Sequence, residues 1–93
     1  MAEKILTRHP ENKQGVNIDK NKYDAIRKAI LDALNVHQEI RFKDLADAVD
    51  QELEGNFVGS IPWYVTTVKL DLEARGIIER VPKSSPQRLR RAP

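Results

Sequence analysis

Three stretches of this 93-residue sequence place apolar residues at the three- and four-residue spacing of an amphipathic helix. The first covers residues 20–35 and follows Asp19, a residue type that caps helix N-termini. The second covers residues 43–53. The third begins after Ser60, another capping residue type, and ends at Gly76, because glycine readily adopts the positive φ that stops a helix. The sequence therefore predicts three helices.

Two shorter patterns predict strands. Residues 39–42 alternate polar and apolar positions, which is enough for one very short strand. The apolar residues 77–81 follow the third helix, and a turn rich in Pro and Ser at 82–86 separates them from the basic segment 87–91. The expected order is helix, strand, helix, helix, strand, turn and strand. This order predicts a mainly α fold with a small β-hairpin.

The apolar residues among the first 18 positions show no regular spacing. Isolated apolar residues such as Ile5 and Val16 stand among polar ones, and a His9-Pro10 pair interrupts any regular element. We therefore predict an irregular N-terminal arm at 1–18 and one domain at 19–91, which is a normal size for a small single core.

The third predicted helix has two apolar sides. When successive residues advance by about 100° around the axis, one side forms a continuous core face. The opposite side carries a thinner apolar stripe of Trp63, Leu70 and Ala74, flanked by Thr66 and Thr67. The residues that we expect to converge on one interior are Ile26, Ile30, Leu34, Leu45, Val49, Val65, Val68, Leu72 and Ile77.

Segments 42–46 and 65–80, together with the basic hairpin after them, resemble the winged helix-turn-helix superfamily, including the multiple-antibiotic-resistance-type repressors. The stretch 59–65 is also similar to a small uncharacterised bacterial winged-helix family. The resemblance spans residues 19–91. It implies a winged helix-turn-helix fold, DNA binding and a role in transcriptional regulation, although winged helices also serve as dimerisation and partner modules.

Charge is unevenly distributed along the chain, although the net charge is only +2. The segment from Arg80 to the C-terminus carries +5 and contains no acid, so the remaining residues carry −3. Residues 39–54 contain six acids against two cations. A positive field is therefore expected only at the C-terminal end.

DNA contact is the first functional hypothesis. Guanidinium groups and hydroxyls in the turn and return strand suit phosphate contacts, and outward threonines of a recognition helix can reach base edges. A basic tail that only keeps the protein soluble is the alternative interpretation of the same residues. The DNA-binding candidates are Ser60, Thr66, Thr67, Lys69, Lys83, Ser84, Ser85, Arg88, Arg90 and Arg91.

A protein contact is the second hypothesis, and it involves Trp63, Leu70 and Ala74. The third helix is electrically neutral, because its cations are balanced by Asp71 and Glu73. A neutral surface with an outward Trp suits a protein partner better than a base edge. The N-terminal arm, a second copy of the chain or another protein could cover this stripe, and we expect a homodimer.

No constellation in the sequence predicts catalysis or a cofactor. The chain has no cysteine, and His9 and His37 lie in separate irregular segments, which does not favour a metal site. No apolar run approaches the roughly 20 residues that span a bilayer, and the N-terminus lacks the features of a signal peptide. We therefore expect a non-enzymatic cytoplasmic protein with no membrane contact.

Overall fold

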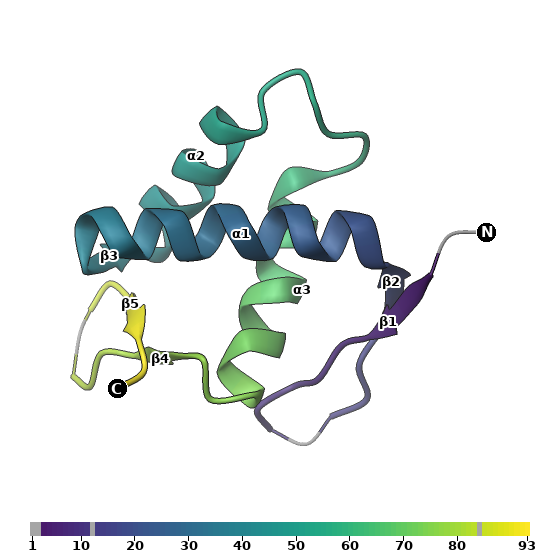
Figure 1. Ribbon diagram of the computed structural model, residues 1–93. Coiled ribbons are helices and arrows are strands. Elements are labelled where there is room, and N and C mark those ends of the chain that lie inside the picture. Colours follow the sequence, from purple (N-terminus) through teal and green to yellow (C-terminus); the bar gives the residue numbers. More distant parts are fainter. Residues whose placement is uncertain (1–2, 12, 84) are drawn as a thin grey trace.

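The computed structural model describes residues 3–11, 13–83 and 85–93. Within them the chain forms a small α+β domain with three helices and two antiparallel sheets (Figure 1). The helices are α1 (Lys20–His37), α2 (Phe42–Glu52) and α3 (Ile61–Ala74). The strands are β1 (Lys4–Leu6), β2 (Asn17–Asp19), β3 (Glu39–Arg41), β4 (Ile78–Arg80) and β5 (Arg88–Arg91).

The predicted helix starts are confirmed by capping hydrogen bonds. The Asp19 carboxylate accepts a hydrogen bond of 2.8 Å from the Asn21 N–H, and the Ser60 hydroxyl accepts one of 3.3 Å from the Trp63 N–H. Each bond satisfies a backbone donor that has no partner inside its helix. The third helix ends before Gly76, whose φ of +74° is the expected stop.

The second sheet joins segments that are distant in the sequence. Its strand order is β3-β5-β4, so the last strand lies between the other two and pairs antiparallel with both. The β4–β5 hairpin lies where the sequence predicted it. Position Leu89 of β5 faces Ile40 of β3 in this register, and both side chains are buried.

The N-terminal arm contains two strands, so the prediction of an irregular arm was wrong. β1 pairs with β2 through Lys4–Asp19, Ile5–Ile18 and Leu6–Asn17. Beyond the ladder, Thr7 and Val16 are joined by two hydrogen bonds of 2.9 Å. Strands of three residues are too short for an alternating pattern to be recognised, which is why the sequence did not indicate them.

The core prediction is confirmed at eight of nine positions, which are all at most 2% exposed. The exception is Ile77, which is half-buried, whereas the next residue, Ile78, is 1% exposed. The strand begins at Ile78, one residue later than expected. Because successive strand residues point to opposite faces, this shift of one position turns Ile78 towards the core and Ile77 away from it. The helix α3 lies at the centre, in contact with α1, α2 and β4, and α1 crosses in front of it in Figure 1.

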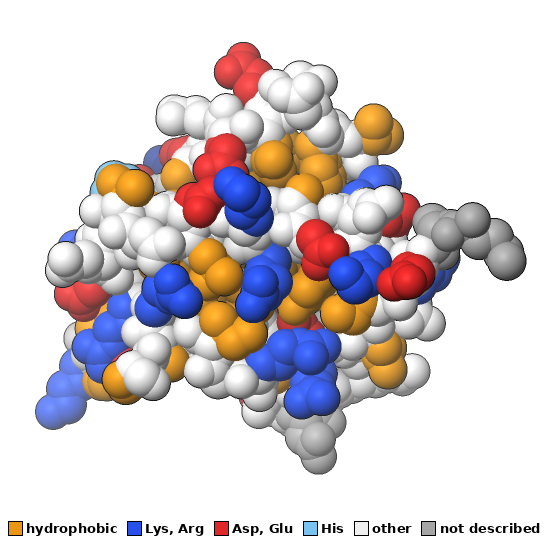
Figure 2. Space-filling view, in the orientation of Figure 1, with side chains coloured by type: hydrophobic (Ala, Val, Ile, Leu, Met, Phe, Trp, Pro, Cys, Tyr) orange, Lys and Arg blue, Asp and Glu red, His pale blue; other side chains and the backbone are white. Residues whose placement is uncertain are grey.

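The surface on the side of α1 is unevenly charged. Figure 2 shows Lys and Arg side chains below α1, towards the C-terminal end of α3 and towards β5, with few Asp or Glu side chains among them.

Candidate functional site

The outward face of α3 is the first candidate surface. Trp63 is 45% exposed, Thr66 is exposed, and Thr67 and Leu70 are half-buried. No charged side chain of α3 lies on this face: Lys69 and Asp71 are buried, and the Glu73 side chain is only 6% exposed. The structure thus brings the predicted stripe together on a face that is apolar and uncharged.

Lys69 was predicted as a DNA contact on the outward side of the third helix, but the structure buries its side chain. The residue is 5% exposed, and its ammonium nitrogen lies 3.4 Å from a carboxylate oxygen of Glu73. It also lies 5.2 Å from the centre of the Phe42 ring. Burial lowers the pKa of Lys69, and Glu73 opposes that shift. The position flanks the core face of the helix rather than its outward side, so Lys69 is a structural residue.

Glu73 forms ion pairs with two cations. One carboxylate oxygen accepts a hydrogen bond of 2.8 Å from Nε of Arg80, and the other lies 3.4 Å from Lys69. The second contact is an ion pair without hydrogen-bond geometry, and this oxygen has no hydrogen-bond partner among the described residues. The Glu73–Arg80 pair ties α3 to β4 and reduces the positive charge that Arg80 offers to a ligand.

Aromatic side chains gather at the start of α3. Trp63 and Tyr64 meet edge to face at 4.9 Å between ring centres, and Tyr64 meets Phe57 in the same way at 5.2 Å. The Lys22 ammonium lies 5.5 Å from the Tyr64 ring centre and 5.9 Å from that of Phe57. Val58 is 81% exposed in the connection before the helix. The exposed apolar surface therefore extends from the stripe into the α2–α3 connection.

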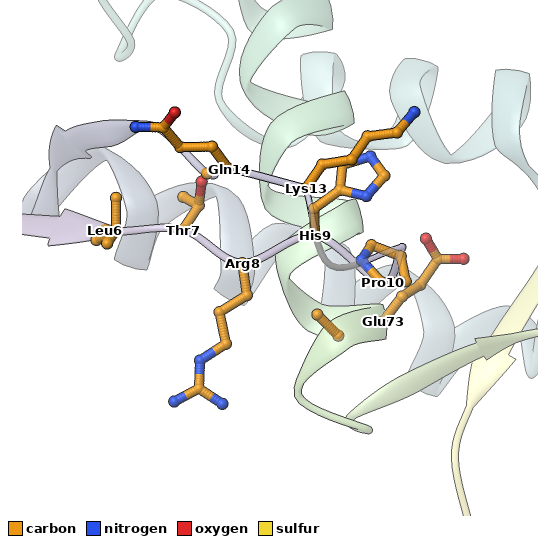
Figure 3. Close-up of a pocket in the computed structure, with 10 residues that line it drawn as sticks. Leu6, Thr7, Arg8, His9, Pro10, Lys13, Gln14 and Glu73 are labelled. Carbon is orange, nitrogen blue, oxygen red and sulfur yellow. The ribbon is translucent and has the colours of Figure 1, made fainter.

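The other end of the stripe faces the N-terminal arm. An open pocket of about 590 Å³ separates the arm from the end of α3, and Ala74 forms part of its wall (Figure 3). His9 and Lys13 lie on one side of this pocket, whereas the Arg8 side chain points away from them. The arm therefore covers the Ala74 end, and the Trp63 end remains open.

Asp71 connects the arm, α1 and α3, and the sequence did not indicate this role. It is fully buried and accepts hydrogen bonds from the Tyr23 hydroxyl, from Nε of Arg75 at 2.8 Å and from the Arg8 backbone N–H at 2.8 Å. Burial, followed by the hydrogen bond to Asp71, raises the pKa of Tyr23 to about 12. The sequence places Arg75 one turn after Asp71, but Tyr23 is 48 residues away.

The basic wing carries less free charge than its sequence indicates. Nε of Arg90 lies 2.6 Å from the Glu79 carboxylate, and Glu39 stands opposite Arg90 on the other neighbouring strand. Arg91 donates a hydrogen bond of 2.8 Å to the Asn35 side chain on α1. Glu79 thus neutralises Arg90 once the sheet has formed.

The remaining predicted wing residues lie at the surface. Lys83, Ser85 and Arg88 are exposed, and Arg88 pairs in register with Arg41 of β3. Ser84 lies outside the described residues. These positions are close to the start of α2, since Phe42 N–H donates a hydrogen bond of 3.1 Å to the Gln87 carbonyl.

Comparison with known proteins places the chain in a family. The family described as "Family of unknown function (DUF6958)" matches residues 4–89. The chain belongs to this DUF6958 family. No curated protein and no solved structure matches it. The DUF6958 match begins in β1 and ends in β5, so the family region includes both the arm hairpin and the basic wing.

The described part of this DUF6958 protein contains no group of three or more His, Asp or Glu side chains that could hold a metal ion. Among the described helices, none combines the length and apolar character that crossing a bilayer requires. The candidate surfaces of this DUF6958 member are therefore the outward face of α3 and the cations around the wing and α1.

Proposed function

We propose that this DUF6958 protein is an interaction module of the winged-helix type that forms a homodimer through the outward face of α3. The order α1-β3-α2-α3-β4-β5, with β5 between β3 and β4, supports the winged-helix part of the proposal. The β1–β2 hairpin is an addition at the N-terminus.

The observation that carries the proposal is the exposure of Trp63 on a helix whose charges are all turned inward. A phosphate backbone needs cations at the contact, and the outward face of α3 supplies none. Protein interfaces instead concentrate aromatic side chains at their centres and exclude charge there. Leu70 extends the apolar surface, and the exposed hydroxyl of Thr66 lies between it and Trp63 on the helix.

Placing a charge in this face tests the proposal. Thr66 is exposed, so Thr66→Glu should leave the fold intact. The new carboxylate would be buried without a partner in the dimer, and we expect association to weaken about tenfold or more. Sedimentation equilibrium measures the dissociation constant. Gln51→Glu, on the exposed side of α2, adds the same charge elsewhere and should leave association unchanged. A monomeric parent protein at high concentration would contradict the proposal.

DNA binding in transcriptional regulation is the second candidate function. Exposed cations at Lys43, Lys83 and Arg88 surround the junction of the wing with the start of α2, and Arg41 stands opposite Arg88. Arg41 is itself paired with Asp44 at 2.8 Å, which reduces the field there. If the wing binds DNA, a Lys83→Gln/Arg88→Gln variant should lose affinity and salt dependence together in a titration with duplex DNA. Unchanged binding by this variant would show that the wing does not contact DNA.

A further inference from the structure

Arginines from several elements lie along one side of α1, and only Arg91 among them belongs to the wing considered above. Tyr23, Arg27, Leu31 and Asn35 succeed one another at four-residue intervals and therefore share one side of this helix. Asn35 holds Arg91 at the C-terminal end of α1 by the 2.8 Å hydrogen bond. The row thus begins at Tyr23 and ends at an arginine from β5.

Asp71 holds the side chain of Arg75 and the backbone of Arg8 at the Tyr23 end. It binds Nε of Arg75 and the backbone N–H of Arg8, each at 2.8 Å, while Tyr23 donates to the same carboxylate. Arg75 therefore contacts this negative charge through its guanidinium group, and Arg8 contacts it through its backbone. Arg27 follows Tyr23 by one turn of α1, which places its side chain beside that of Tyr23.

The cations of this row keep donors for a ligand. Within residues 3–11, 13–83 and 85–93, neither Arg8 nor Arg27 forms an ion pair with a carboxylate. Arg75 binds Asp71 through Nε, which leaves its terminal nitrogens, and its side chain is 27% exposed. Arg8 and Arg91 are exposed, and Arg27 is half-buried. We call Arg8, Arg27, Arg75 and Arg91 the arginine face; Figure 2 views the molecule from the side of α1.

We propose that the arginine face binds the phosphate backbone of a double-stranded nucleic acid. Twelve residues of helix separate Tyr23 from Asn35, a length of about 18 Å. Phosphates follow each strand of a duplex at intervals of about 3.4 Å along its axis, so this length covers several of them. One small anion cannot contact both ends of the row, whereas a backbone can. Guanidinium groups bind phosphate through two parallel hydrogen bonds, which favours arginine over lysine here.

The surroundings of the row favour nucleic acid over an acidic protein. Protein contacts depend on buried aromatic or aliphatic anchors, and the row offers only the half-buried Leu31 between its charges. The exposed Trp63 and Val58 belong to α3 and to the connection before it. The site is separate from the dimer contact, so both could operate in one assembly.

Two triple variants of equal charge test this assignment in the full chain. Arg8→Gln/Arg27→Gln/Arg91→Gln removes three cations of the row and spares Arg75, because Arg75 also holds the buried Asp71. Arg8 binds Asp71 through its backbone, so that contact survives the change. The control, Lys4→Gln/Lys28→Gln/Lys43→Gln, also removes three exposed cations, none of which belongs to the arginine face or to the wing hairpin. Thermal melts of both variants establish that each is folded.

The measurement is fluorescence anisotropy with a duplex DNA of random sequence at several salt concentrations. The Arg8→Gln/Arg27→Gln/Arg91→Gln variant should bind the duplex about tenfold more weakly or worse. The slope of log K against log salt should fall by about 2–3, since each phosphate contact contributes about 0.9. The control should change the slope by less than one. Equal or larger losses in the control, salt-independent binding, or no binding by the parent would overturn the proposal. So would displacement of the duplex by millimolar inorganic phosphate at constant ionic strength, because this would indicate an isolated anion site.

Discussion

At the scale of single residues, buried polar groups rather than surface charges organise this molecule. Asp71 is fully buried and has three donors, and Lys69 is buried against Glu73. A buried carboxylate is stable only when its hydrogen bonds are complete, so each donor matters. Asp71 therefore fixes the arm, α1 and α3 relative to one another.

Removal of the Tyr23 hydroxyl should lower the free energy of unfolding in a pH-dependent way. Tyr23→Phe should cost about 1–3 kcal/mol at neutral pH, because a hydrogen bond to a charged group is lost. The pKa of Tyr23 is raised from 10 to about 12, so the folded state holds this proton more tightly than the unfolded state. The contribution is therefore complete below pH 10 and is lost as the pH rises from about 10 to 12. Urea titrations of parent and variant should converge over that interval. A constant difference up to pH 12 would show that the hydroxyl does not titrate with folding.

At the scale of elements, the sequence predicts those that are long enough to show a period. The three helices and the β4–β5 hairpin lie where expected, because their apolar spacing extends over one or more turns or is bounded by Gly and Pro. β1 and β2 were missed, since three residues carry no recognisable alternation. The charge of the wing was overestimated for another reason: Glu73 and Glu79 form ion pairs with Arg80 and Arg90 only after the chain has folded.

The outward face of α3 was predicted correctly for Trp63 and wrongly for Lys69. A helical wheel separates the two opposite sides of a helix well, but it does not show how wide the buried arc is. α3 is central and touches elements on both flanks, so its buried arc includes Lys69 and Asp71. Hydrogen bonds between distant segments, such as Tyr23 with Asp71, have no signal in one sequence.

The stability of the β1–β2 hairpin should depend on the absence of a side chain at Gly15. A Cβ atom at this position would lie 1.6 Å from the Thr7 carbonyl oxygen, so Gly15→Ala must push the two strands apart. We expect a loss of about 1–3 kcal/mol and faster amide exchange at Thr7, Arg8 and Lys20, whose N–H groups are bonded in the hairpin or to Asp71. Gly55→Ala is the matched control, since its Cβ meets no atom within 4 Å and only its positive φ of +76° is strained. Equal exchange in both variants would indicate that the arm is held by other contacts.

At the scale of the whole molecule, two surfaces with different chemistry lie on different sides. The outward face of α3 is apolar and uncharged, and the arginine face is polar and cationic. Association of two copies through α3 would leave an arginine face on each protomer available. A dimer would then present two sets of cations to one polyanion, which raises its apparent affinity without any new contact.

The single Trp of the chain can report this association directly. Trp63 is 45% exposed in one copy, so its emission should be close to that of a solvated indole when the protein is dilute. Burial against a second copy should shift the emission to shorter wavelength as concentration rises, because the indole leaves water. Thr66→Glu should abolish the shift, and Gln51→Glu should preserve it. The midpoint of the shift should also agree with the dissociation constant from sedimentation. An emission maximum that is independent of concentration, in a parent that sediments as a dimer, would place the contact on another face.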